Sequence, residues 1–262
     1  MKIIDGGVTA AKGFKAASTA AEIKYKGRTD MAMVFSEVPC VAAGTFTTNV
    51  VKAAPVRWDQ DIVYNHPGAR AVICNSGIAN ACTGEEGFGL LQGNRQGSIR
   101  SLGIPEDSVL VASTGVIGMQ LPIDRIANGV KAMAPKLEGS REAGLEAAKA
   151  IMTTDTEKKE AAVEIEIGGK TVTVGGMCKG SGMIHPICAR CLDLSLVMWI
   201  SPRNFFRKHS ARISRTPTTW YPLTEIPPQT ILSSSLQTAR PAIRRSQRKT
   251  QIMKSSKKLL TT

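Results

Sequence analysis

The sequence predicts an α/β fold, with mixed layers of helices and strands, over residues 1–186. Two observations predict it. Short β-branched or apolar runs alternate with Gly, Asn, Ser and Thr turns, and segments with helical spacing lie between these runs. The chain has 262 residues and is 42% hydrophobic, which is enough to build a packed core.

The expected elements are few and short. In chain order we expect strands at 31–35, 40–46 and 71–74, a helix that a Thr83-x-x-Glu86 capping box opens toward Leu102, helices at 121–133 and 141–152, and strands at 161–167 and 170–174. Helices thus alternate with strands along the chain. This order is typical of α/β or α+β architecture.

The last two strands give the clearest local signal. Gly168-Gly169 separates them, which predicts a β-hairpin. Gly169-Lys170-Thr171 also has the form of the end of a phosphate-binding loop, but Glu164 stands where that loop needs a glycine. Because a carboxylate there would repel phosphate, we interpret the segment as a hairpin turn.

The net charge of +13 lies almost entirely in the last part of the chain. Residues 1–186 carry 20 Lys and Arg against 19 Asp and Glu, whereas residues 187–262 carry 14 against 2. The second segment is also rich in Ser, Thr and Pro, so we expect a basic tail without a native fold. We interpret it as a solvated, disordered tail and expect no nucleic-acid partner; the alternative is a non-catalytic fragment whose basic arm binds nucleic acid.

Several functional classes find no support. No apolar stretch is long enough to span a membrane and the N-terminus has no targeting pattern, so we expect a cytoplasmic protein with no membrane partner. The three histidines have no spacing that suggests a catalytic triad or a metal site. Cys188-x-x-Cys191 would be half of a zinc site, but no second pair follows it, and we expect no metal.

What remains is a set of small, polar segments punctuated by glycine. Their backbone N–H groups and hydroxyls could surround a small polar substrate or a developing oxyanion, although each segment alone could also be a tight turn. They are Gly6-Gly7-Val8-Thr9-Ala10-Ala11-Lys12-Gly13-Phe14, Asn75-Ser76-Gly77, Ala79-Asn80-Ala81-Cys82-Thr83-Gly84, Ala112-Ser113-Thr114-Gly115-Val116-Ile117-Gly118, Met152-Thr153-Thr154-Asp155-Thr156 and Lys179-Gly180-Ser181-Gly182-Met183-Ile184-His185-Pro186.

In this order, the segments resemble the ornithine acetyltransferase (glutamate N-acetyltransferase) family of arginine biosynthesis across residues 6–186. One departure is Ile78, where the family usually has Asn, and it puts a polar contact near that loop in doubt. The resemblance implies a self-processing fold, no cofactor, and transfer of acetyl from N-acetylornithine to glutamate; some members also accept acetyl-CoA. It further implies a heterotetramer of two alpha and two beta chains, with residues 1–186 as the alpha-chain part.

The resemblance also assigns site residues. Thr114 and Gly115 match the pair that forms the family's oxyanion hole, and Thr153 and Lys179 match substrate-binding positions. The family nucleophile is a threonine in "HPNM(A/C)TML", and the precursor cuts itself immediately before it. Arg190 occupies that position here, and a protonated guanidinium is not a nucleophile, so we expect the chain as written to be inactive.

A displaced reading frame accounts for this interruption. Residues 187–192 can be encoded ATA TGT GCA CGA TGC TTG after a CCA codon for Pro186. Read from the last base of that CCA, the codons become AAT ATG TGC ACG ATG CTT, which encode the missing Asn-Met-Cys-Thr-Met-Leu. Our hypothesis is a single-base deletion, or a sequencing error, at the Pro186 codon. It also accounts for the change in charge.

Overall fold

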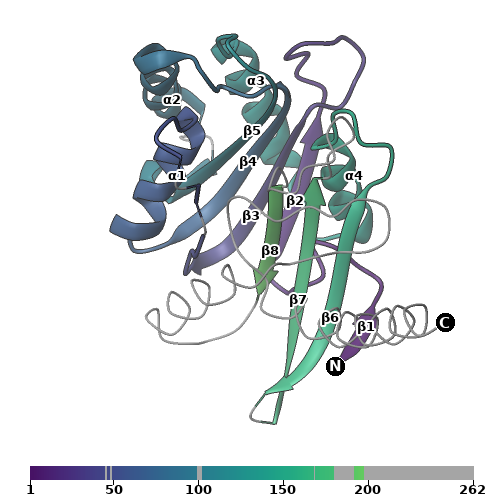
Figure 1. Ribbon diagram of the computed structural model, residues 1–262. Coiled ribbons are helices and arrows are strands. Elements are labelled where there is room, and N and C mark those ends of the chain that lie inside the picture. Colours follow the sequence, from purple (N-terminus) through teal and green to yellow (C-terminus); the bar gives the residue numbers. More distant parts are fainter. Residues whose placement is uncertain (45, 48, 99–101, 168, 180–191, 198–262) are drawn as a thin grey trace, which may run out of the picture.

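The computed structural model describes residues 1–44, 46–47, 49–98, 102–167, 169–179 and 192–197 (Figure 1). Its strands are β1 (Lys2–Ile4), β2 (Phe14–Thr19), β3 (Met31–Cys40), β4 (Ala69–Ile78), β5 (Val109–Val116), β6 (Lys159–Ile167), β7 (Lys170–Lys179) and β8 (Leu192–Val197). Its helices are α1 (Ala54–Asn65), α2 (Gly84–Ser98), α3 (Ile123–Met133) and α4 (Arg141–Ala150), with short 3-10 turns η2 (Glu106–Ser108) and η3 (Ala134–Lys136).

The described strands form two four-stranded sheets. The first has the order β1-β6-β7-β8 and is antiparallel throughout. The second has the order β2-β3-β4-β5, in which β4 and β5 are parallel and the other neighbours antiparallel. Because parallel neighbours need a crossover connection, α2 and η2 lie between β4 and β5 in the chain. The predicted α/β class with mixed layers is confirmed.

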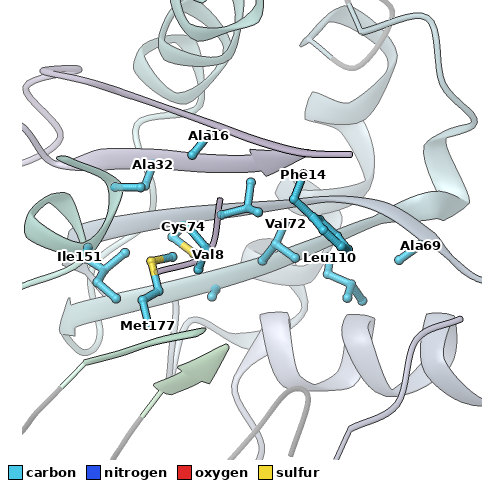
Figure 2. Close-up of a cluster of buried hydrophobic side chains, with 14 of the residues drawn as sticks. Val8, Phe14, Ala16, Ala32, Ala69, Val72, Cys74, Leu110, Ile151 and Met177 are labelled. Atoms are coloured by element: carbon cyan, nitrogen blue, oxygen red, sulfur yellow. The ribbon is translucent and has the colours of Figure 1, made fainter. Parts of the chain in front are cut away.

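The second sheet is buried on both faces. Consecutive residues of β3, such as Met33 and Val34, belong to different apolar clusters, because successive side chains of a strand point to opposite faces. The Val34 cluster also contains Met177 of β7 and Ile151, which follows α4, so it fills the space between the two sheets (Figure 2). The Met33 cluster contains Met133 of α3. The sheet therefore lies between the first sheet and α3.

Helix α1 covers the edge strand β5. The indole Nε1 of Trp58 donates to the carbonyl of Val109 at 3.0 Å, and the carboxylate of Asp59 accepts from the Val111 N–H at 2.8 Å. Unpaired backbone groups at a sheet edge invite pairing with another chain unless something covers them. Two consecutive helical side chains thus satisfy a carbonyl and an N–H that an additional strand would otherwise bind.

Most of the expected elements are present. β6 and β7 form the predicted hairpin, paired from Ile167↔Lys170 onward, with Gly169 at φ 74°. The predicted helices correspond to α2, α3 and α4. The Ser140 hydroxyl caps α4 by accepting from the Ala143 N–H at 3.1 Å.

One expectation is wrong. Of the described residues between 40 and 46, only Cys40 belongs to a strand, because β3 ends there after a register shift that begins at Phe35. The basic tail without a native fold stays a prediction; within it, Leu192–Val197 form β8 against β7. The rest of 187–262, with its two interpretations, lies outside the described residues.

Candidate active site

The carboxyl ends of β4 and β5 bring the first pair of predicted site residues to one edge of the sheet. Their parallel register places Ser76 beside Thr114 and Gly77 beside Gly115. In α/β sheets, ligands bind outside the carboxyl ends of parallel strands. Thr114 is half-buried and donates its hydroxyl to the Asn75 carbonyl at 3.3 Å, whereas Gly115 is exposed.

Gly115 must be glycine because the two strands touch here. Its φ is 132°, a value that side chains rarely allow, and an added Cβ would lie 2.2 Å from the Gly77 carbonyl carbon and 2.3 Å from its oxygen. Backbone cannot move aside as a flexible side chain can. The missing side chain at Gly115 therefore allows the backbones of β4 and β5 to approach each other closely.

The loop after β4 is held by hydrogen bonds to β5. The Ala79 N–H donates to the Val116 carbonyl and the Gly118 N–H to the Ala81 carbonyl, both at 2.8 Å. Just before this loop, at the end of β4, the Asn75 carboxamide donates to the Ile78 carbonyl at 2.9 Å. The Ile78 side chain is buried in the Met33 cluster, so the residue that departs from the family pattern serves the core.

Thr153 lies just beyond α4, in a turn that is tied to β4. The Ser76 hydroxyl donates to the Ala150 carbonyl at 2.9 Å. The Arg28 guanidinium donates to the carbonyl of Met152 and, at 3.3 Å, to that of Thr153. The turn that carries Thr153 is thus fixed by one contact from β4 and by a second from the loop between β2 and β3.

Lys179, the last residue of β7, reaches the same turn. Its Nζ lies 3.4 Å from Asp155 Oδ1, and both side chains are buried, with exposed fractions of 11% and 3%. The same Oδ1 atom accepts from the Thr153 N–H at 2.9 Å. One carboxylate therefore contacts both predicted substrate-binding residues.

These contacts join the four predicted site residues into one continuous series. Thr114 lies beside Ser76, whose hydroxyl donates to Ala150 at the end of α4, three residues before Thr153. Asp155 then contacts both Thr153 and Lys179. The fifth predicted position, Arg190, lies outside the described residues. Sequence reasoning assigned no role to the connecting residues, although Ser76 and Asp155 lie inside the glycine-punctuated motifs. Arg28 lies in none of them, and no sequence signal marks it.

Two buried titratable residues lie near the candidate site: Asp59 of α1 and Cys74 of β4. Burial raises the pKa of Asp59 well above its ordinary value, and the hydrogen bond from the Val111 N–H opposes this only in part. Burial, and then the nearby charge of Asp59, raises the pKa of the Cys74 thiol to about 12. Because the thiolate is the reactive form, Cys74 is not a nucleophile at neutral pH.

Among the residues that the structure describes, no three His, Cys, Asp or Glu side chains are grouped so that they could hold a metal ion. Within the same residues, no helix has the length and apolar character needed to cross a membrane. Cys188 and Cys191, at which no metal is expected, lie outside the described residues.

Comparison with known proteins places this geometry in a family. A sequence model of the ArgJ family matches residues 15–197. The arginine biosynthesis bifunctional protein ArgJ of Gloeobacter violaceus is 50% identical over 190 residues, which are 72% of this chain and 46% of the relative. That of Symbiobacterium thermophilum is 50% identical over 194 residues, 73% of this chain and 48% of the relative. The chain thus spans about half the length of the curated relatives it matches.

Solved structures agree with the sequence match. The bifunctional protein ArgJ from Bacillus halodurans superposes with a TM-score of 0.66 at 43% identity, covering 71% of this chain and 96% of that chain. Ornithine acetyltransferase from Mycobacterium tuberculosis, solved in complex with ornithine, gives a TM-score of 0.62 at 42% identity, covering 71% and 97%. The sequence resemblance is therefore confirmed, and the chain belongs to the ArgJ family.

Proposed function

We propose that this chain carries the N-terminal half of an acetyltransferase of arginine biosynthesis, which moves acetyl from N-acetylornithine to glutamate. The observation that supports it best is the continuous series of contacts from Thr114 and Gly115, through Ser76, to Thr153 and Lys179. It links residues from both sheets that supply the groups acyl transfer needs: donors for an oxyanion and a cation for a carboxylate.

Thr114 and Gly115 would stabilise the oxyanion. When a nucleophile attacks the acetyl carbonyl, negative charge develops on the carbonyl oxygen, and donors fixed in advance lower the barrier. We assign this role to the backbone N–H of Gly115 and to the hydroxyl of Thr114, which would rotate from the Asn75 carbonyl to the oxyanion. The exposure of Gly115 at the carboxyl end of β5 supports the assignment, because ligands of α/β sheets bind at that end of parallel strands.

Thr153 and Lys179 would bind the amino-acid part of the substrate. Both N-acetylornithine and glutamate carry an α-carboxylate, and the ammonium of Lys179 is a suitable partner for it. The Mycobacterium tuberculosis relative, solved with ornithine, supports an ornithine-type ligand for this site. Acetyl-CoA would be an additional acetyl donor, and no cofactor is required.

The nucleophile belongs to the part of the family pattern that is missing here. We propose a threonine that is freed by self-cleavage and assisted by its own α-amine, within a cytoplasmic assembly of two alpha and two beta chains. In this chain Arg190 occupies that position, so the 262-residue protein would not form the acetyl ester.

The test compares two proteins. One is the 262-residue chain, and the other is made after one base is restored at the Pro186 codon. We expect acetylglutamate from N-acetylornithine and glutamate with the restored protein, together with its cleavage into two chains, and none with the 262-residue chain. A parallel assay with acetyl-CoA identifies the donors. Absence of acetyl transfer by a folded and cleaved restored protein would contradict the proposal, and resequencing the DNA at this codon tests the frameshift itself.

A further inference from the structure

We propose that Asp155 is a positioning residue, which holds the Lys179 ammonium and the Thr153 backbone in one fixed relation so that together they receive the substrate's carboxylate. The inference deepens the proposed function and rests on it. Asp155 itself would not touch the substrate. It would act through Lys179.

The geometry that carries this inference is a shared oxygen atom. Asp155 Oδ1 accepts the Thr153 N–H at 2.9 Å and lies 3.4 Å from Lys179 Nζ. The first contact is local and shapes the turn, since an Asp side chain often bonds backbone two residues away. The second contact joins that turn to the end of β7, 24 residues later. A single atom thus sets the distance between two elements.

Burial strengthens the attraction between Asp155 and Lys179. The Asp155 side chain is 3% exposed and that of Lys179 is 11% exposed, so water screens their attraction poorly. A buried charge is tolerated when an opposite charge accompanies it, and removing one partner leaves the other uncompensated. Asp155 therefore offsets the cost of keeping a lysine in a buried position.

The turn is also held from its other side. Arg28 donates to the carbonyls of Met152 and Thr153, while Asp155 binds the Thr153 N–H. Thr153 is consequently restrained at both of its backbone polar groups. Such restraint is typical of residues that must present a binding group within about 0.5 Å of a productive position.

A double-mutant cycle on the full 262-residue chain tests whether Asp155 acts through Lys179. Ornithine binding is measured by calorimetry for the wild type, Asp155→Asn, Lys179→Met and the double variant. Asn keeps the shape of Asp and can still accept the Thr153 N–H, but it cannot balance the charge. We expect D155N to weaken ornithine binding about tenfold when Lys179 is present and less than about twofold in the K179M background. Equal weakening in both backgrounds would overturn the proposal.

A second measurement needs no bound ligand. The rate at which acetic anhydride modifies Lys179 is compared with that of exposed Lys159 in the same sample, by mass spectrometry. We expect D155N to raise the relative rate at Lys179 at least about threefold, because losing the negative charge of Asp155 favours the neutral, reactive amine. Glu157→Gln removes an exposed carboxylate from the same segment and should change neither this rate nor ornithine binding.

The two measurements separate the inference from the function on which it rests. If the folded wild-type chain binds no ornithine while D155N still raises the reactivity of Lys179, substrate binding by this chain is wrong and the link between Asp155 and Lys179 stands. An unchanged reactivity in D155N would refute the link itself. If D155N does not fold, Asp155→Glu, which keeps the charge but moves it by one methylene, is measured in the same two ways.

Discussion

The carboxylate of Asp59 accepts a hydrogen bond from the backbone N–H of Val111 at 2.8 Å, so a helical acid takes the place of a neighbouring strand at the edge of the second sheet. Its other oxygen, Oδ2, is buried and has no hydrogen-bond partner among the described residues. An acid in this environment keeps its proton more readily than one in water, because burial disfavours the charged form.

We therefore predict that Asp59 makes stability depend on pH. Its pKa is raised in the folded protein, so above the ordinary value near 3.8 the unfolded chain releases a proton that the folded chain retains. The contribution of Asp59 is fully present below that value and is lost as pH rises toward the raised pKa. Asp59→Asn keeps an acceptor for Val111 and cannot ionise.

The measurement is the thermal midpoint between pH 5 and pH 8. D59N should flatten the decline that the wild type shows, so its advantage over the wild type should grow with pH, because Asn has no proton to release. Asp124→Asn, at an exposed position in α3, is the control and should leave the slope unchanged. Parallel slopes for the wild type and D59N would contradict the prediction.

Gly115→Ala should destabilise the protein and abolish acetyl transfer in the restored protein. The added methyl would overlap the Gly77 carbonyl group, and its backbone angle alone costs about 1–3 kcal/mol. Gly118→Ala is a matched control, because its φ is also positive, 77°, but no atom lies within 4 Å of an added Cβ. Urea unfolding should show a loss for G115A larger than that for G118A by at least about 2 kcal/mol. Similar losses would show that the contact with Gly77 is unimportant.

Arg28→Lys should loosen the turn that carries Thr153. A guanidinium can donate to two carbonyls at once, whereas an ammonium on a flexible stem holds them less firmly. We expect faster amide hydrogen exchange at 152–155, about fivefold or more. Arg70 also donates to two backbone carbonyls, those of Ser36 and Glu37, so Arg70→Lys should accelerate exchange there and leave the Thr153 turn unchanged. No difference between the two variants at 152–155 would rule out this role for Arg28.

The cysteines should react according to burial. Cys82 is exposed, whereas Cys74 is buried and its thiol pKa is raised to about 12. In the native protein at pH 8, iodoacetamide should modify Cys82 and leave Cys74 almost untouched, since little thiolate forms there. Both should react in urea. Rapid native labelling of Cys74, detected by mass spectrometry, would mean that the region between α1 and β4 opens readily.

Sequence patterns predicted correctly those helices and strands that depend on residues close together in the chain. The hairpin of β6 and β7 follows from Gly168-Gly169 between two β-branched runs, and α4 follows from its spacing after Ser140. The run at 40–46 has similar propensity, but beyond Cys40 its described residues pair with no described strand. By contrast, Ser113, Thr114 and Gly115 have the composition of a turn and nevertheless extend β5, because β4 supplies a parallel partner.

The candidate site shows the same difference between features set by neighbouring residues and features set by contacts across the fold. Thr114, Gly115, Thr153 and Lys179 could be named from short motifs, since each motif is contiguous in the chain. The residues that assemble them could not. The bond from Ser76 to Ala150 spans 74 residues and that from Asp155 to Lys179 spans 24, and contacts of this kind exist only after folding. β8 was missed because the average composition of the tail concealed six residues that complete a sheet.

The contact between Gly77 and Gly115 also limits how this protein can diverge. In most packed interiors a larger residue at one position can be accommodated by a smaller one beside it. Here the obstacle to a side chain at 115 is the main chain of Gly77, and Gly77 already has no side chain to give up. No compensating substitution at residue 77 is available, so descendants of this sequence should retain position 115 as glycine even where the surrounding residues drift.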